Sequence, residues 1–117
     1  MIQRFSQGPR MSQAVVAGGF IFLAGQVAAD ANPSVANQSR QILDQIDGLL
    51  TQCGATRRDL VNVSVWLADI QSFQDFNDVW DCWIPTDNTP ARATVEAKLA
   101  FPEYLVEIAA IAYKQDH

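Results

Sequence analysis

The sequence predicts a single α+β domain, in which about six mostly antiparallel strands form a sheet and two helices cover one of its faces. Three observations support this prediction: a glycine pair joins two β-rich segments, two apolar stripes recur at helical spacing, and two further β-rich segments end the chain. A chain of 117 residues is long enough for one hydrophobic core, so we expect one domain over residues 1–117.

The first three elements are expected to be strands. Residues 2–6 form a short one, and residues 13–17 and 20–24 are rich in β-branched and aromatic side chains. Gly18 and Gly19 lie between the last two segments, and such a pair suits the positive φ angles of a tight turn. We therefore expect a hairpin here.

A helix is expected over residues 35–53, followed by a short turn and a strand. Ser34 and Gly54 are typical start and end signals for the helix. Its apolar stripe consists of Val35, Ile42, Ile46, Leu49, Leu50 and Cys53. Thr56 and Asp59 have the spacing of a capped turn, and apolar and other residues then alternate over residues 61–67, which predicts a strand.

The remaining elements are expected to be a second helix and two strands. Ser72 and Asp75 indicate the helix start, and Pro85 indicates its end. The apolar stripe of this helix is Phe73, Phe76, Trp80 and Trp83. Residues 92–100 and 105–113 are then expected to pair as a hairpin, which completes the order β-β-β-α-β-α-β-β.

Two helices, each about 10 Å across, can cover only one face of a sheet nearly 30 Å wide. In the last strand, Val106, Ile108, Ala110 and Ala112 point to one face, while Leu105, Ala109 and Ile111 point to the other. Because both faces are apolar, we expect the uncovered one to pack against other subunits.

Composition excludes several classes of function. The net charge of -5 argues against a nucleic-acid partner, and we expect no membrane partner and a cytoplasmic location because no apolar segment has membrane-spanning length. Cys53 and Cys82 fall in expected helices, where we expect reduced core thiols. The single histidine is His117, which argues against Ser-His or Cys-His catalysis and a histidine zinc site.

Two charged residues are the main candidates for chemistry. Glu107 lies within an otherwise apolar strand, and Arg92 begins the strand before it. In the expected hairpin, Arg92, Thr94 and Glu107 share a face. The same register places Lys98 opposite Glu107, so a structural ion pair is an alternative that the pattern alone favours.

Two weaker candidates have ordinary structural explanations beside the functional one. Asn77 interrupts the apolar stripe of the second helix. Its functional explanation is a polar contact at a cleft, and its structural explanation is a solvated or capping residue near the helix start. Gly25 leaves backbone groups open for a ligand at a strand end, or allows a bulge or close strand packing.

The chain resembles the Rid family of reactive-intermediate deaminases, also called the YjgF family. The resemblance rests on Pro90-Ala91-Arg92-Ala93-Thr94-Val95 and Val106-Glu107-Ile108-x-x-Ile111-Ala112, and on two further segments, Phe20-Ile21-Phe22-Leu23-Ala24-Gly25-Gln26-Val27 and Phe76-Asn77-Asp78-Val79-Trp80. It covers nearly the whole chain. It implies a chorismate-mutase-like domain that assembles as a homotrimer, with small-molecule clefts between subunits.

The resemblance also implies a cofactor-free activity, the hydrolysis of reactive enamines or imines such as 2-aminoacrylate to a 2-keto acid and ammonia. Arg92 then binds the substrate carboxylate, Thr94 and the Gly25 backbone complete the cradle, and Glu107 activates water. The substrate-binding set that we expect is Arg92, Thr94, Gly25, Met11 and Asn77. No metal ligand is expected.

The sequence departs from the family pattern at two places. The best-characterised deaminases of the family carry Gly-Pro-Tyr where this chain has Gly8-Pro9-Arg10-Met11, so Met11 is expected to replace their substrate-contacting Tyr. Thr94 stands where a Cys is often found. These changes resemble those of a divergent subgroup, and Arg10 either adds a second positive group that selects a larger or more acidic ligand or is simply solvated.

Two other functions compete with the deaminase. In the first, the trimer binds a small carboxylate or metabolite and regulates without catalysis, and pairing of Glu107 with Lys98 would favour this function. The second, a ribonuclease, is disfavoured by the acidic composition and by the lack of an internal histidine.

Overall fold

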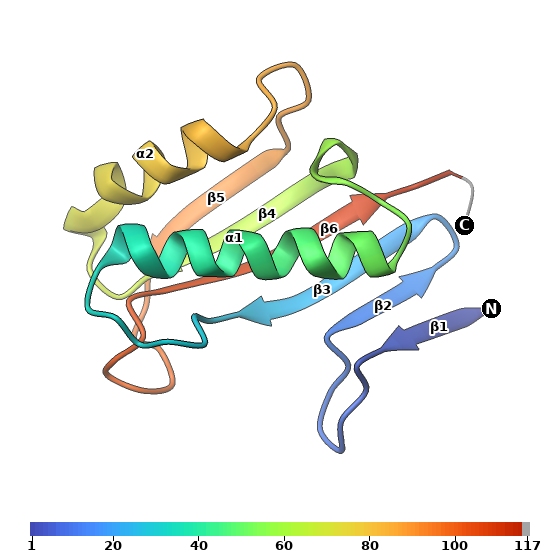
Figure 1. Ribbon diagram of the computed structural model, residues 1–117, viewed down its shortest axis with the longest axis horizontal. Coiled ribbons are helices and arrows are strands. Elements are labelled where there is room, and N and C mark those ends of the chain that lie inside the picture. Colours follow the sequence, from blue (N-terminus) through green and yellow to red (C-terminus); the bar gives the residue numbers. More distant parts are fainter. Residues whose placement is uncertain (116–117) are drawn as a thin grey trace.

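The computed structural model describes residues 1–115 as one six-stranded sheet with two helices on one face, which confirms the predicted fold class and element order (Figure 1). The strands are β1 (Ile2–Phe5), β2 (Ala14–Ala17), β3 (Phe20–Gln26), β4 (Leu60–Leu67), β5 (Ala91–Glu96) and β6 (Val106–Tyr113). The helices are α1 (Val35–Gln52) and α2 (Phe73–Trp83), with short 3-10 turns η1 (Arg57–Asp59) and η2 (Ile70–Ser72). Across the sheet the strand order is β1-β2-β3-β6-β4-β5.

The molecule is flat, with extents of 41, 37 and 20 Å. A thickness of 20 Å accommodates one sheet and one helix layer, because these layers pack about 10 Å apart. The opposite face of the sheet, which we call the open face, is therefore uncovered within one chain. His117 lies outside the described residues.

The hairpin of β2 and β3 forms as predicted, with Ala17 opposite Phe20. Gly18 alone of the pair has a positive φ, 62°. Gly19 is needed for a different reason, because a Cβ there would lie 2.6 Å from the ring of Tyr113 on β6.

Both ends of α1 follow the predicted signals. The Ser34 side chain accepts a hydrogen bond from the Asn37 backbone N–H, and Gly54 has a φ of 77° just beyond the helix. Thr56 and Asp59 form the predicted capping box around η1. The helix packs its apolar stripe on the sheet, where Ile42, Ile46 and Leu50 are buried.

The start of α2 differs in detail from the prediction. Ser72 is at the N-cap position, but its side chain makes no capping bond and instead donates to the Asp69 carbonyl at 2.6 Å. The cause is η2, which precedes the helix directly and draws the hydroxyl back to the previous turn. The helix ends at Trp83, ahead of Pro85.

The predicted hairpin of the last two strands is wrong. β4 lies between them and pairs with β5 in parallel and with β6 in antiparallel orientation. The parallel pairing results from the crossover through α2, and residues 97–105 then carry the chain past the end of β4. Hydrogen bonds from Ala97 N–H to Leu67 O and from Ala68 N–H to Leu105 O fasten this crossing.

The core lies between the helices and the sheet, and it includes Val106, Ile108, Ala110 and Ala112 of β6 as predicted. Neither Cys53 nor Cys82 forms a disulfide, and only Cys53 is buried. The predicted burial of Cys82 is wrong, because its side chain is exposed where it lines a groove between α1 and α2. Burial raises the pKa of the Cys53 thiol. Within residues 1–115, no helix has the length and apolar character that crossing a membrane requires.

Candidate functional site

Arg92 projects from β5 toward α2 and is half-buried. Its Nη2 donates to Asn77 Oδ1 at 2.8 Å. Three aromatic rings of α2 surround its guanidinium carbon, with centroids at 5.8 Å for Phe73, 5.3 Å for Phe76 and 5.2 Å for Trp80. These distances fall within the range of cation–π attraction. The structure thus brings Arg92 and Asn77, two predicted site residues, into direct contact.

The guanidinium retains one complete edge for a ligand. Arginine has five N–H donors, and Asn77 is the only hydrogen-bond acceptor found for Arg92 among the described residues. The guanidinium has two edges with paired N–H donors, one formed by Nε and Nη2 and the other by Nη1 and Nη2. Each edge uses a different hydrogen of Nη2, so the bond to Asn77 occupies one edge only. The other edge keeps the two parallel donors that match a carboxylate.

Burial lowers the pKa of the Arg92 guanidinium, while the negative charge of Asp81 acts in the opposite direction. Arginine nevertheless stays protonated, because its usual pKa is far above neutrality. None of the ion pairs among the described residues involves Arg92. Its positive charge is therefore held by a neutral amide and by ring faces.

Thr94 lies two residues farther along β5 and points to the same face. Arg92 and Thr94 are opposite Val63 and Val65, which are buried beneath the helices. The Thr94 hydroxyl is inaccessible to solvent and has no hydrogen-bond partner in the described structure. A buried hydroxyl without a partner is costly, so Thr94 offers a donor and an acceptor beside Arg92.

Glu107 and Gly25 meet on the open face. A Cβ added at Gly25 would lie 2.2 Å from Glu107 Oε2, so the carboxylate rests directly on the glycine backbone. The pairing of β3 with β6 shifts between Leu23 and Gln26, which is a β-bulge. The bulge and the close packing that the sequence left open for Gly25 are both present.

Arg92 and Glu107 are on opposite faces of the sheet. Arg92 is paired with Val63 of β4, and Glu107 is paired with Trp66 of the same strand. Because these β4 positions differ by three, their side chains point in opposite directions. The prediction that Arg92 and Glu107 share a face is wrong, since it depended on the hairpin that β4 interrupts.

The predicted pair of Lys98 and Glu107 is wrong for the same reason. Lys98 follows β5 in the crossing segment, whereas Glu107 is opposite Trp66. The ion pairs found among residues 1–115 do not include either residue. Pairing of Glu107 with Lys98, which would have favoured binding without catalysis, is therefore not found among the described residues.

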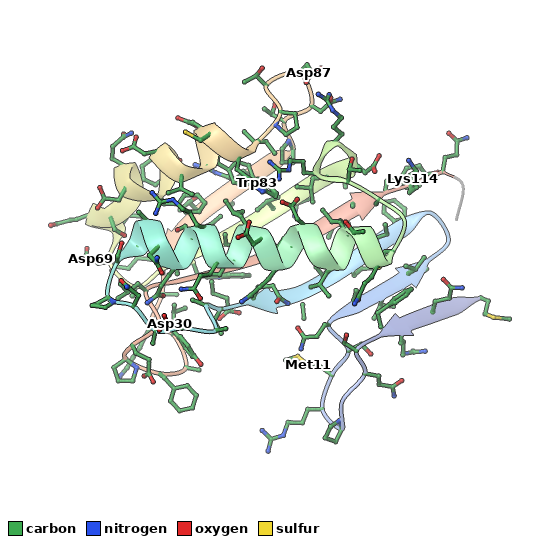
Figure 2. The ribbon with its side chains drawn as sticks, viewed as in Figure 1. Met11, Asp30, Asp69, Trp83, Asp87 and Lys114 are labelled. Carbon is green, nitrogen blue, oxygen red and sulfur yellow. The ribbon has the colours of Figure 1, made fainter. Side chains whose placement is uncertain are left out.

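Met11 lies apart from both groups, on the loop between β1 and β2, away from the two helices (Figure 2). Its side chain is exposed, and it borders a hollow of about 310 Å³ together with Arg4 and Arg10. Within one chain the structure does not bring Met11 together with the other predicted site residues.

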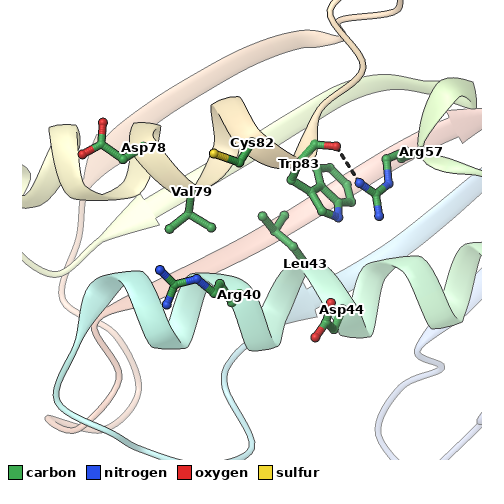
Figure 3. A pocket seen from close by; sticks show the side chains of 8 residues that line it. All are labelled: Arg40, Leu43, Asp44, Arg57, Asp78, Val79, Cys82 and Trp83. Atoms are coloured by element: carbon green, nitrogen blue, oxygen red, sulfur yellow. Dashed lines mark hydrogen bonds between the residues drawn. The ribbon is translucent and has the colours of Figure 1, made fainter.

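A separate groove of about 290 Å³ runs between α1 and α2 and contains none of the predicted site residues (Figure 3). Arg57 donates to the backbone oxygen of Trp83, and both Arg57 and the Trp83 indole donate to Asp47. Arg57 also stacks on the Trp83 ring at 4.6 Å. The contacts join the two helices to η1, which gives this groove a structural explanation.

The aromatic surroundings of Arg92 were missed in the sequence. Phe73, Phe76 and Trp80 were assigned to the apolar stripe that packs on the core. The available signal was the place of Asn77 within that stripe, because a polar residue between the buried rings of Phe76 and Trp80 needs a polar partner. Without the topology, nothing indicated that this partner was Arg92.

Comparisons with known proteins agree with this architecture. The family model described as Endoribonuclease L-PSP matches residues 1–114. A RutC family protein of Haemophilus influenzae is 35% identical over 112 residues, which are 95% of this chain and 97% of that protein. A RutC family protein of Haemophilus ducreyi is 33% identical over 108 residues, or 92% of each chain.

Solved structures give the same result. A member of the YjgF protein family from Neisseria meningitidis has a TM-score of 0.96 and 41% identity, covering 100% of this chain and 98% of its own. A protein of the conserved Rid family from Yersinia pestis has a TM-score of 0.86 and 28% identity, covering 92% and 90%. Because sequence and fold both match over nearly the whole length, the chain belongs to the Rid family, also called the YjgF family.

Proposed function

We propose that this protein is a cytoplasmic hydrolase that converts reactive imines of 2-keto acids, together with their enamine tautomers, to the keto acid and ammonia. The observation that carries the proposal is the unpartnered edge of the Arg92 guanidinium, with the unbonded Thr94 hydroxyl beside it. A fork of two parallel N–H donors is suited to the carboxylate that every such substrate carries. Membership of the Rid family supports the reaction class.

Glu107 supplies the second function of the proposed site. A half-buried carboxylate on an otherwise apolar strand can accept the proton of a water molecule as the water attacks the imine carbon. Gly25 limits the positions that this carboxylate can take, and its backbone borders the same space.

The proposed reaction balances without a cofactor. As the water oxygen bonds to the imine carbon, Glu107 takes one water proton, the second pair of the C=N bond moves to nitrogen, and the proton is passed on to that nitrogen to give a carbinolamine. The hydroxyl proton of the carbinolamine then passes through Glu107 to the amine nitrogen, the C–N bond breaks, ammonia leaves and the C=O bond forms. Water and the imine are thereby converted to one keto acid and one ammonia.

Two copies of the chain must cooperate in this reaction, because Arg92 and Glu107 are on opposite faces of one sheet. We propose that the chain forms a homotrimer in which Arg92 of one copy and Glu107 of another border the same intersubunit cleft. Met11 is proposed to extend into this cleft from its loop. The apolar open face supports assembly, since Phe20, Phe22 and Tyr113 on it are each more than two fifths exposed.

The first test measures ammonia and keto-acid release from a panel of enzymatically generated imines. We expect Arg92→Ala and Glu107→Ala each to lower the rate by about 100-fold or more without unfolding the protein. Arg92→Lys should also be poor, because an ammonium cannot reproduce the fork. Wild-type rates in Arg92→Ala would refute the carboxylate clamp.

Mixing the two inactive variants tests whether the site is shared. If each site takes Arg92 and Glu107 from different copies, random mixing in denaturant and refolding restores about a quarter of the sites. The control is the refolded wild type, and each variant refolded alone should stay inactive. No recovery in the mixture would mean that both residues must belong to one copy, which contradicts the shared site.

A second candidate function, binding of a small carboxylate without catalysis, is favoured by one observation. Arg92 is equipped for a carboxylate within a single chain, whereas Glu107 is not near it. Calorimetric binding of a 2-keto acid that depends on Arg92, combined with no acceleration of any imine, would replace the deaminase with this function.

A further inference from the structure

We propose that α2 acts as a holder that fixes the orientation of Arg92, with Asn77, Phe73 and Trp80 as positioning residues of the carboxylate clamp. This inference rests on the proposed function, because the clamp is the feature that the holder serves. It differs from the expectation that Asn77 contacts the substrate, since Asn77 here acts through Arg92. The residues concerned lie on one helix and face one side chain.

The holder has a physical task. An arginine side chain has several rotatable bonds, and fixing it on binding costs conformational entropy. β5 is also the edge strand of the sheet, so among residues 1–115 no neighbouring strand flanks Arg92 on its outer side. A guanidinium that is fixed before the ligand arrives avoids this cost, which is the general advantage of preorganisation.

The chemistry of the holder leaves the charge available. An aspartate at position 77 would also accept from Arg92 Nη2, but it would neutralise the cation that must attract a carboxylate. The amide of Asn77 accepts the same hydrogen bond without adding a charge. The ring faces likewise attract the cation without an anion, so the holder fixes Arg92 and preserves its affinity for an anionic ligand.

One side of this holder is accessible. Phe73 is 40% exposed, whereas Phe76 and Trp80 are buried. Asn77 is half-buried at the border between them. Substitutions at Phe73 and Asn77 therefore change the holder without opening a cavity in the core, and they are the variants suited to a test.

The test observes Arg92 directly by ¹⁵N NMR of its guanidinium group in the full-length assembled protein. The Arg92 signals are assigned by their absence from Arg92→Ala. In the wild type we expect slow rotation of the guanidinium and separate Nη signals. In Asn77→Leu and Phe73→Leu we expect faster rotation, which merges these signals, while the fold measured by circular dichroism is retained.

Binding of 2-oxobutanoate, a small 2-keto acid, gives the second readout. We expect the dissociation constant to rise about tenfold in Asn77→Leu, which corresponds to about 1.4 kcal/mol. Asn77→Asp should keep the separate Nη signals and still weaken binding, because its carboxylate offsets the charge. This split between rotation and binding would not arise from a general loss of structure.

Two residues of the same helix provide matched controls. Gln74→Leu removes an exposed amide that bonds to Asp78, and Cys82→Ser changes another exposed side chain of the helix. Both should leave the Arg92 signals and the dissociation constant unchanged. Unaltered Arg92 signals in Asn77→Leu and Phe73→Leu would overturn the holder. The two proposals can also be told apart. If rotation is slow in the wild type and fast in Asn77→Leu, but the wild type binds no keto acid, the holder is supported and the proposed function is refuted.

Discussion

Gly25 and Glu107 are in direct contact across β3 and β6, and this contact limits what either position can be. The glycine matters here for its missing side chain, because no positive φ is found at this position. Any larger residue must displace the carboxylate that we assign to water activation. The bulge next to Gly25 places its backbone against Glu107.

At this scale we expect Gly25→Ala to separate stability from activity. The added Cβ displaces the far end of a flexible side chain, so the free energy of unfolding should fall by only about 1 kcal/mol. Turnover should fall toward that of Glu107→Ala, which chemical denaturation and an imine assay on the same samples would reveal.

Gly48→Ala is the matched control for this substitution. Gly48 lies within α1 and faces open space, so alanine there should stabilise the helix by about 0.5–1 kcal/mol and leave turnover unchanged. Full turnover in Gly25→Ala would contradict the assigned position of the Glu107 carboxylate.

Among the elements, the segment that crosses from β5 to β6 is held by one fully buried side chain. Gln38 of α1 donates to the carbonyls of Asn32 and Glu103 at 2.8 and 3.0 Å, and its Oε1 accepts from Leu105 N–H at 2.9 Å. It thereby ties the start of a helix to the residues that lead into β6. A buried amide with these bonds is not recognisable from the apolar pattern of the helix.

At the scale of elements we expect Gln38→Leu to lower the free energy of unfolding by about 2–3 kcal/mol. The substitution removes three hydrogen bonds of a fully buried amide, and each such bond contributes about 1 kcal/mol. Urea denaturation followed by circular dichroism measures the loss.

Gln45→Leu, one heptad later on the same helix and half-buried, is the control and should change stability by no more than about 0.5 kcal/mol. Equal effects of the two substitutions would show that the hydrogen bonds of Gln38 contribute nothing specific.

For the molecule as a whole, the open face is the surface that remains to be covered. It carries side chains from several strands at cross-strand positions: Phe20 with Tyr113, Phe22 with Ile111, and Trp66 with Glu107. A hollow of about 230 Å³ bordered by Phe22, Asn62 and Ile111 lies on it. Such a surface on a thin two-layer domain favours association between copies.

The corresponding prediction concerns Ile111→Asp. A carboxylate at the centre of the open face would be buried without a partner in an assembly, so we expect the proposed trimer to dissociate into folded monomers. Sedimentation at micromolar concentration would show the change. Ile70→Asp, an equally drastic substitution at an exposed residue of η2 and outside the sheet, should leave the assembly intact. A monodisperse wild-type monomer would refute the assembly itself.

The sequence by itself determined the elements, because the signals for strands, helices and their ends are local. The glycine turn at Gly18, the cap at Ser34 and the two apolar stripes of the helices depend on neighbouring residues along the chain. It also singled out Arg92 and Glu107, since charged residues in apolar strands violate a local pattern.

Only the tertiary structure decided which strands are neighbours and which face each residue occupies. Strands that follow each other in the sequence need not pair in the sheet. Because β4 lies between β5 and β6, Arg92 and Glu107 are on opposite faces. The tertiary structure also brought Asn77 and the rings of α2 to Arg92, across 15 residues of chain in the case of Asn77. Pairing over such separations depends on the burial of whole elements, and no local pattern encodes it.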